Sequence, residues 1–91
     1  MLEPIFTSQF YKDFKKVKKQ GKNTRILKQI IDSIVSERKL DAKFKDHKLI
    51  GNYLGCRECH VDPDLLLIYQ VATGDFVKFM RPGSHATLFK K

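Results

Sequence analysis

Residues able to do chemistry are concentrated in the segment GCRECHVDPDLLLIYQ, which runs from Gly55 to Gln70. Within it, Cys56, Cys59 and His60 have the spacing of a c-type haem attachment site. That site needs both sulfurs on one side of a helical turn, whereas the surrounding β-type pattern predicts a strand. Residues three apart in a strand point to opposite faces. We therefore expect no haem, and two cysteines that are small buried thiols.

The histidines offer a second kind of chemistry, which is metal binding. Zinc would accept a ligand set of His47, His60, Asp64 and His85, but the spacing of these residues along the chain matches no common zinc pattern. The cysteines also lack the second pair that a structural zinc site would need. The sequence therefore predicts no metal and no other cofactor.

Proton transfer is a third possibility for the same side chains. General acid–base catalysis needs one group that accepts a proton and another that donates one. Histidine suits both proton steps, because its ordinary pKa of about 6.5 lets one ring accept while another donates near neutral pH. Three histidines and one carboxylate could therefore supply both the acid and the base. A single histidine on a strand is nevertheless more often a structural, hydrogen-bonded residue.

The N-terminal half predicts the elements that would support these residues. Leu2 to Phe6 can form a strand, and Thr7 or Ser8 can cap a basic helix that ends at Gly21. A second helix begins near Asn23 or Thr24, and its apolar residues have the spacing of a core-facing stripe: Leu27, Ile30, Ile31 and Ile34. Residues 40–51 have no sustained period and predict a loop.

The C-terminal half has the pattern of a sheet. Strands are predicted at residues 56–61, 65–72, 75–81 and, as an option, 85–89, with turns at residues 62–64, 73–75 and 81–84. This order predicts an α+β fold in which two N-terminal helices pack on one face of a small antiparallel sheet. A chain of 91 residues makes one domain, which spans residues 1–91.

Charge restricts the partners. The formal net charge is +8, and most of it lies in residues 1–50. Domains of this kind bind nucleic acid, anionic membranes or acidic proteins. No apolar run approaches the roughly 20 residues of a membrane span, and the first residues, MLEPIFTSQF, lack the pattern of a secretory signal. We therefore expect a cytoplasmic protein without a membrane partner.

Two segments, DHKLIGNYLGCRECHVDPDLLLIYQV and MRPGSHATLF, resemble the YafQ family of bacterial toxins in the RelE/ParE superfamily. The matching elements include Asp46-His47, Arg57-Glu58-Cys59-His60, Pro63-Asp64 and Gly83-Ser84-His85. Over the first half, the resemblance rests on helix order and basic character. Two positions depart from the family pattern: Leu65, where many relatives have Trp, and Pro82, which stiffens the chain before His85.

The resemblance implies a ribosome-associated, metal-independent mRNA endoribonuclease that inhibits translation and is neutralised by a cognate acidic antitoxin. It also implies a RelE-like order, β-α-α-β-β-β with an optional last strand. Catalytic roles carry over to four residues: His60 or His47 as the base, His85 as the acid, and Asp64 orienting a histidine. The RNA contacts that we expect are Arg81 on the scissile phosphate, with Lys43, Lys45, Lys48, Glu58 and Phe89 around it.

Two other functions stay open at this point. A ParE-like toxin would share the fold but act by binding gyrase, and it would need no acid or base. A basic RNA-binding or antitoxin-type module would act through charge alone, so its affinity would depend on salt and not on His85. New 5′ ends on mRNA would distinguish the nuclease from both.

Overall fold

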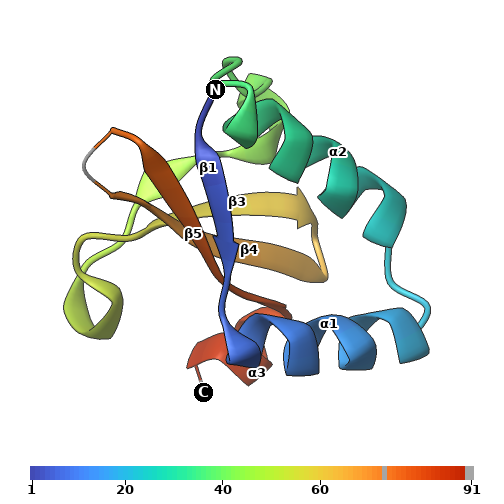
Figure 1. The fold of residues 1–91 in the computed structure, drawn as a ribbon. Coiled ribbons are helices and arrows are strands. Elements are labelled where there is room, and N and C mark those ends of the chain that lie inside the picture. The colour runs from blue at the N-terminus through green and yellow to red at the C-terminus, as the bar shows by residue number, and fades with distance from the viewer. Residues whose placement is uncertain (73, 90–91) are drawn as a thin grey trace.

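The structure is a computed structural model that describes residues 1–72 and 74–89 (Figure 1). Its elements follow in this order: β1 (Glu3–Phe6), α1 (Ser8–Lys19), α2 (Thr24–Val35), the short 3-10 helix η1 (Ala42–Phe44), β2 (His47–Lys48), a second 3-10 helix η2 (Gly51–Tyr53), β3 (Arg57–Asp62), β4 (Leu65–Ala72), β5 (Phe76–Gly83) and α3 (His85–Phe89). The predicted α+β class is confirmed.

The five strands form one sheet in the order β1-β5-β4-β3-β2. Neighbours from β2 to β5 pair antiparallel, as expected. The first strand differs, because β1 runs parallel to β5, with Glu3 opposite Phe76 and Phe6 opposite Phe79. The sheet is therefore mixed, and its edge joins the beginning of the chain to its C-terminal third.

Both long helices begin and end where capping chemistry predicts. The Thr7 hydroxyl accepts the Phe10 N–H at 2.9 Å at the start of α1, and the Asn23 side chain accepts the Ile26 N–H at 3.1 Å at the start of α2. Gly21, with a φ of 74°, turns the chain after α1 in the left-handed conformation that glycine adopts at little cost. The two predicted helices are therefore confirmed.

One face of the sheet carries the main core. Cys59 and Val61 of β3, Leu65, Leu67 and Tyr69 of β4, and Val77 and Phe79 of β5 pack against apolar residues of both helices: Phe10, Val17, Leu27, Ile30, Ile31 and Ile34. Because strand residues alternate between faces, Glu58 and His60 point to the other side of the sheet. That side is where the candidate site lies.

A smaller apolar cluster covers part of this second face. Leu88 of α3 packs with Cys56, Leu66 and Ile68, and partly buried Leu49, Tyr53, Met80 and Phe89 surround them. The cluster seats α3 over β4 and β5. No helix in the described ranges is long and apolar enough to cross a membrane.

Three details differ from the sequence-based expectations. Residues 85–89 form a helix instead of the optional strand, because the Ser84 hydroxyl accepts the Thr87 N–H at 3.1 Å and caps it. The turn predicted at 81–84 is wrong over most of its length, since β5 continues through Gly83. The loop at 40–51 contains the two-residue strand β2. Thr73, in another predicted turn, lies outside the described residues.

Candidate active site

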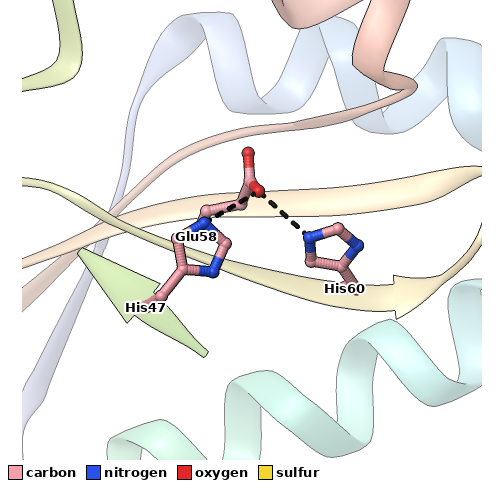
Figure 2. A group of neighbouring side chains, drawn as sticks. All are labelled: His47, Glu58 and His60. Atoms are coloured by element: carbon pink, nitrogen blue, oxygen red, sulfur yellow. Dashed lines mark ion pairs between the residues drawn. The ribbon is translucent and has the colours of Figure 1, made fainter. Parts of the chain in front are cut away.

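Two histidines meet one carboxylate on the open face of the sheet. The Nε2 atom of His47 lies 3.4 Å from Oε1 of Glu58, and the Nε2 atom of His60 lies 3.2 Å from the same oxygen. Figure 2 shows both rings turned toward this oxygen. The ring centroids of His47 and His60 are 5.9 Å apart. Glu58 therefore joins two of the predicted catalytic residues.

Strand geometry explains why these residues converge. Glu58 and His60 are two residues apart on β3, so they share a face. His47 on β2 is directly opposite Glu58 in the antiparallel register, which places the two side chains next to each other. Glu58 was predicted as an RNA contact, and its central position was not. Its place depends on β2, which is too short to give a periodic signal.

Burial makes Glu58 the fixed point of this group. Its side chain is 6% exposed, against 48% for His47 and 33% for His60. Its second oxygen, Oε2, is buried and has no hydrogen-bond partner among the described residues. An ionised carboxylate in such a place needs compensating positive charge. The two imidazoles are the nearest groups that can supply it.

The backbone fixes the orientation of His47. Its Nδ1 atom lies 2.7 Å from the carbonyl oxygen of Lys45. A carbonyl only accepts, so Nδ1 carries a proton and Nε2 is the nitrogen turned to Glu58. Lys45 has a φ of 51°, in the left-handed region that few non-glycine residues adopt. Backbone strain beside a candidate site is a feature that functional sites often have.

Arg81 lies level with Glu58 in the register of the sheet, two strands away, but its side chain already forms an ion pair. The register places it opposite Ile68, which is itself opposite Glu58. Its guanidinium donates to buried Asp13 of α1, with Nε at 2.7 Å and Nη2 at 3.0 Å. The hydrogen bonds to Asp13 raise the pKa of the Arg81 guanidinium. Asp13 was not predicted as a partner, because only the packing of α1 against β5 brings it there.

Asp64 and His85 lie toward one end of the sheet, outside the group around Glu58. The register places His60 opposite Leu66 and Leu66 opposite Gly83, two residues before His85. Asp64 is exposed in the β3–β4 turn, where its carbonyl accepts from the Lys22 ammonium at 3.0 Å. His85 is exposed and lies against the ring of Phe89, with centroids 4.8 Å apart. Among the described residues, the side-chain nitrogen and oxygen atoms that gather within 4.8 Å of one another come from His47, Glu58 and His60, and not from Asp64 or His85.

The three lysines predicted to contact RNA do not all lie near the candidate site. Exposed Lys43 and Lys45 line a groove with His60, between η1 and the end of β3. Lys48 follows His47 on β2 and pairs with Arg57, so alternation directs it to the opposite face. The structure therefore brings Lys43 and Lys45, but not Lys48, close to the candidate site.

The opposite face holds a partly buried polar network that the sequence did not reveal. Asp46 accepts from the Tyr69 hydroxyl at 2.6 Å and from Nε of Arg57 at 3.2 Å. Burial, followed by the hydrogen bond to Asp46, raises the pKa of Tyr69. Because Asp46 immediately precedes His47, this network holds the start of β2 against β3 and β4.

The cysteines are buried free thiols, as expected. Burial raises the pKa of Cys59 to about 12, so the thiol form is strongly favoured. Burial also raises the pKa of Cys56. Thiols in this state are poor nucleophiles and poor metal ligands. The chemistry of the segment from Gly55 to Gln70 therefore belongs to its glutamate and histidine.

Comparison with known proteins identifies the class. A family model for YafQ, the bacterial toxin of a type II toxin–antitoxin system, matches residues 2–90. The mRNA interferase toxin YafQ of Escherichia coli K12 is 38% identical over 85 residues, which are 92% of this chain and 91% of that protein. These matches define a toxin of a bacterial type II toxin–antitoxin system.

Solved structures agree in fold along nearly the whole chain. The YafQ structure in the E. coli DinJ–YafQ toxin–antitoxin complex has a TM-score of 0.88 and 35% identity, covering 97% of both chains. A metal-bound toxin from Helicobacter pylori has a TM-score of 0.88 and 38% identity, covering 98% of this chain and 100% of that one. Within its class, the chain belongs to the YafQ family.

Proposed function

We propose that this toxin is a ribosome-associated mRNA endoribonuclease that inhibits translation in the cytoplasm. The observation that carries the proposal is the convergence of His47 and His60 on buried Glu58, beside the lysine-lined groove at Lys43 and Lys45. The relative from E. coli K12 is described as an mRNA interferase. Metal-independent RNA cleavage requires a base for the 2′-hydroxyl and positive charge for the phosphates, and this group and groove can supply both.

His60 is the proposed base. Its Nε2 faces Glu58 at 3.2 Å. When Nε2–H donates to that carboxylate, Nδ1 keeps its lone pair and can accept a proton. Nδ1 would take the proton of the 2′-hydroxyl as that oxygen attacks phosphorus. Glu58 would then stabilise the imidazolium that forms, in the manner of a carboxylate behind a catalytic histidine.

His47 has a different proposed role, because both of its nitrogens are engaged. Nδ1 donates to the Lys45 carbonyl, and Nε2 faces Glu58 at 3.4 Å. With a proton on Nε2 as well, the ring would be an imidazolium facing Glu58. In that form it would stabilise charge on the phosphorus centre.

The remaining roles follow from the positions of His85, Phe89 and Arg81. Exposed His85 would protonate the leaving 5′-oxygen, while the attacking 2′-oxygen closes a 2′,3′-cyclic phosphate. Phe89, whose ring lies against His85, would stack on a base. Arg81 would contact the scissile phosphate by the part of its guanidinium that Asp13 does not occupy. Asp64, which lines one pocket with Ser84, would orient His85.

The test is cleavage of mRNA on ribosomes with new 5′ ends mapped by primer extension. We expect His60→Ala and His85→Ala each to lower cleavage at least about 100-fold, the range of general acid–base contributions, and to relieve growth arrest. Circular dichroism should show an unchanged fold. Lys18→Ala, on the exposed side of α1, is the matched control and should cleave normally. If both histidine variants remain fully toxic, the catalytic assignment is wrong.

The same experiment separates the nuclease from the other functions. A toxin that acts by binding gyrase would produce no new 5′ ends, and an RNA-binding module would retain its affinity after loss of His85. We further propose that a cognate acidic antitoxin neutralises the toxin. The basic first helix, with exposed Lys12, Lys15, Lys16, Lys18 and Lys19, would supply charge complementarity for such a partner.

A further inference from the structure

We propose that Asp13 of α1 is a positioning residue for RNA cleavage, and that its buried carboxylate holds the guanidinium of Arg81 in the orientation that binds the scissile phosphate. The hold itself stands on geometry. Its effect on cleavage rests on the proposed function, in which Arg81 contacts that phosphate. Asp13 would not touch the RNA and would act only through Arg81.

Two parallel hydrogen bonds join the side chains of Asp13 and Arg81. Nε of Arg81 donates to Oδ2 of Asp13 at 2.7 Å, and Nη2 donates to Oδ1 at 3.0 Å. The guanidinium is a rigid planar fork, so a carboxylate that accepts along one edge fixes the plane of the whole group. Both contacts use the edge formed by Nε and Nη2. Nη1 is therefore directed away from Asp13 and is the part left to bind phosphate.

Burial of the ion pair is unequal between its two partners. The side chain of Asp13 is 6% exposed, against 22% for that of Arg81. Removing the cation from a carboxylate buried to this degree is strongly unfavourable. The exposed part of the guanidinium is still accessible to a phosphate. Burial therefore favours a state in which Arg81 stays on Asp13 and offers its outer edge to the RNA.

Asp13 is itself fixed relative to β5. The Gln9 amide, one turn earlier on α1, donates to Oδ1 of Asp13 at 3.1 Å. The Thr7 hydroxyl, which caps α1, donates to the carbonyl oxygen of Met80 at 2.8 Å. Met80 directly precedes Arg81 in the chain. The start of α1 is thus attached to the backbone beside Arg81, which gives the carboxylate a defined place next to the guanidinium.

Aromatic rings connect Arg81 to the proposed acid. Hydrogen bonds to Asp13 and, with a smaller effect, to Tyr53 raise the pKa of Arg81. The Tyr53 ring meets that of Phe89 edge-on, with centroids 5.8 Å apart, and the Phe89 ring lies against His85 at 4.8 Å. These contacts place the guanidinium near the residue that would protonate the leaving oxygen. A misplacement of about 1 Å in such an arrangement can lower the rate about 100-fold.

Nitrogen-15 NMR of the Arg81 side chain tests the hold without any cleavage assay. We expect an Nε–H signal, assigned by its absence from Arg81→Lys, that exchanges slowly with water. In Asp13→Asn the exchange should be at least about tenfold faster, because an amide accepts a weaker hydrogen bond than a carboxylate does. Asp32→Asn, which removes the same charge from an exposed position on α2, is the matched control and should leave the signal unchanged. Equal exchange in wild type and Asp13→Asn would overturn the hold.

Kinetics of mRNA cleavage on ribosomes test the consequence for catalysis. Asp13→Asn should lower kcat about 10- to 100-fold and change KM by less than about threefold, because the contact that it aligns is made in the transition state. Wild type should distinguish the two diastereomers of a scissile phosphate in which sulfur replaces one non-bridging oxygen, and Asp13→Asn should distinguish them less. Ile30→Val, a core substitution in α2, should lower Tm but leave kcat and this discrimination unchanged.

Two further variants separate positioning from a general structural role. Asp13→Glu restores the carboxylate and should recover part of the lost kcat. In the Arg81→Gln background, Asp13→Asn should lower kcat by less than about twofold, because no guanidinium is left to position. Additive losses there, or an unchanged kcat in Asp13→Asn alone, would overturn the positioning role. A slowly exchanging Nε–H in a toxin that produces no new 5′ ends would contradict the proposed function and leave the hold on Arg81 standing.

Discussion

Tyr69 and Asp46 form the shortest hydrogen bond of the polar network behind the histidines, at 2.6 Å. Removal of the hydroxyl in Tyr69→Phe leaves Asp46 without this donor. We expect this to lower the free energy of unfolding by about 1.5–3 kcal/mol at pH 7, the range for a hydrogen bond to a charged group. Urea unfolding monitored by circular dichroism measures the difference.

The pH dependence of this difference has a definite sign. Burial and Asp46 raise the pKa of Tyr69 above its ordinary value of 10.0. The stabilisation from Tyr69 is therefore complete below pH 10 and is lost as the pH rises toward the folded-state pKa. The gap between wild type and Tyr69→Phe should narrow above pH 10, by at most about 1.4 kcal/mol per pH unit. A gap that widens there would contradict the buried, protonated tyrosine.

Individual residues of the candidate site could be named from the sequence, but their grouping could not. His47 and His60 were identified by residue type and by family resemblance. That they share Glu58 depends on a two-residue strand paired across from it, and so short a strand leaves no periodic trace in the sequence. The hydrogen-bonding roles of Asp13 and Asp46 could be recognised only from contacts made across the fold.

At the scale of elements, α3 is positioned by a small residue beneath it. A Cβ on Gly83 would lie 3.1 Å from Cδ2 and 3.4 Å from Cγ of Leu88. Gly83→Ala should push α3 away from β5 and move His85 and Phe89 with it. We expect a loss of about 1–3 kcal/mol in unfolding free energy, the usual cost of overpacking, together with reduced mRNA cleavage. Thermal unfolding and primer extension measure the two effects.

A second substitution distinguishes packing from other causes. Leu88→Val in the Gly83→Ala background shortens the side chain that the new methyl group meets. Both stability and cleavage should partly recover, although Leu88→Val alone should destabilise the wild type. Additive losses in the double variant would mean that Gly83 acts in another way.

Helices and strands differed in how well sequence predicted them. Both long helices were predicted because capping side chains and apolar spacing are local signals. Residues 85–89 are too few to separate helix from strand by period, although Ser84 was available as a cap. Pro82 suggested a turn, but β5 continues through it opposite Leu67. The pairing of β1 with β5 ends at Phe79, so Pro82 has no partner in β1 to which a backbone N–H would have to donate.

At the scale of the whole molecule, the positive charge lies in more than one region of the surface. The lysines of α1 lie on the helical side of the sheet, whereas Lys43 and Lys45 line the groove at His60. For a short single-stranded RNA, Lys43→Gln with Lys45→Asn should weaken binding and lower the salt slope by about 1.4, because each phosphate neutralised on a single strand accounts for about 0.7. Asn suits the left-handed backbone at position 45.

Lys16→Gln with Lys18→Gln is the matched control, since it removes the same charge from α1. The control should leave the salt slope for short RNA nearly unchanged, and fluorescence anisotropy at several salt concentrations measures both variants. Equal weakening in the two double variants would mean that net charge, and not the groove, governs RNA binding. The strand order was unpredictable at this scale, because the pairing of β1 with β5 leaves no local signal.

The parallel pairing of β1 with β5 also has a consequence for synthesis of the toxin. Residues 3–6 are translated long before residues 76–79, which contain their strand partner. The contacts of α1 with β5 also form late, because the Asp13 carboxylate accepts a hydrogen bond from Arg81 of β5. A nascent chain therefore cannot complete its sheet or seat α3 until most of its message has been read. On the proposed function, the toxin could cleave its own messenger only after that round of translation is nearly over.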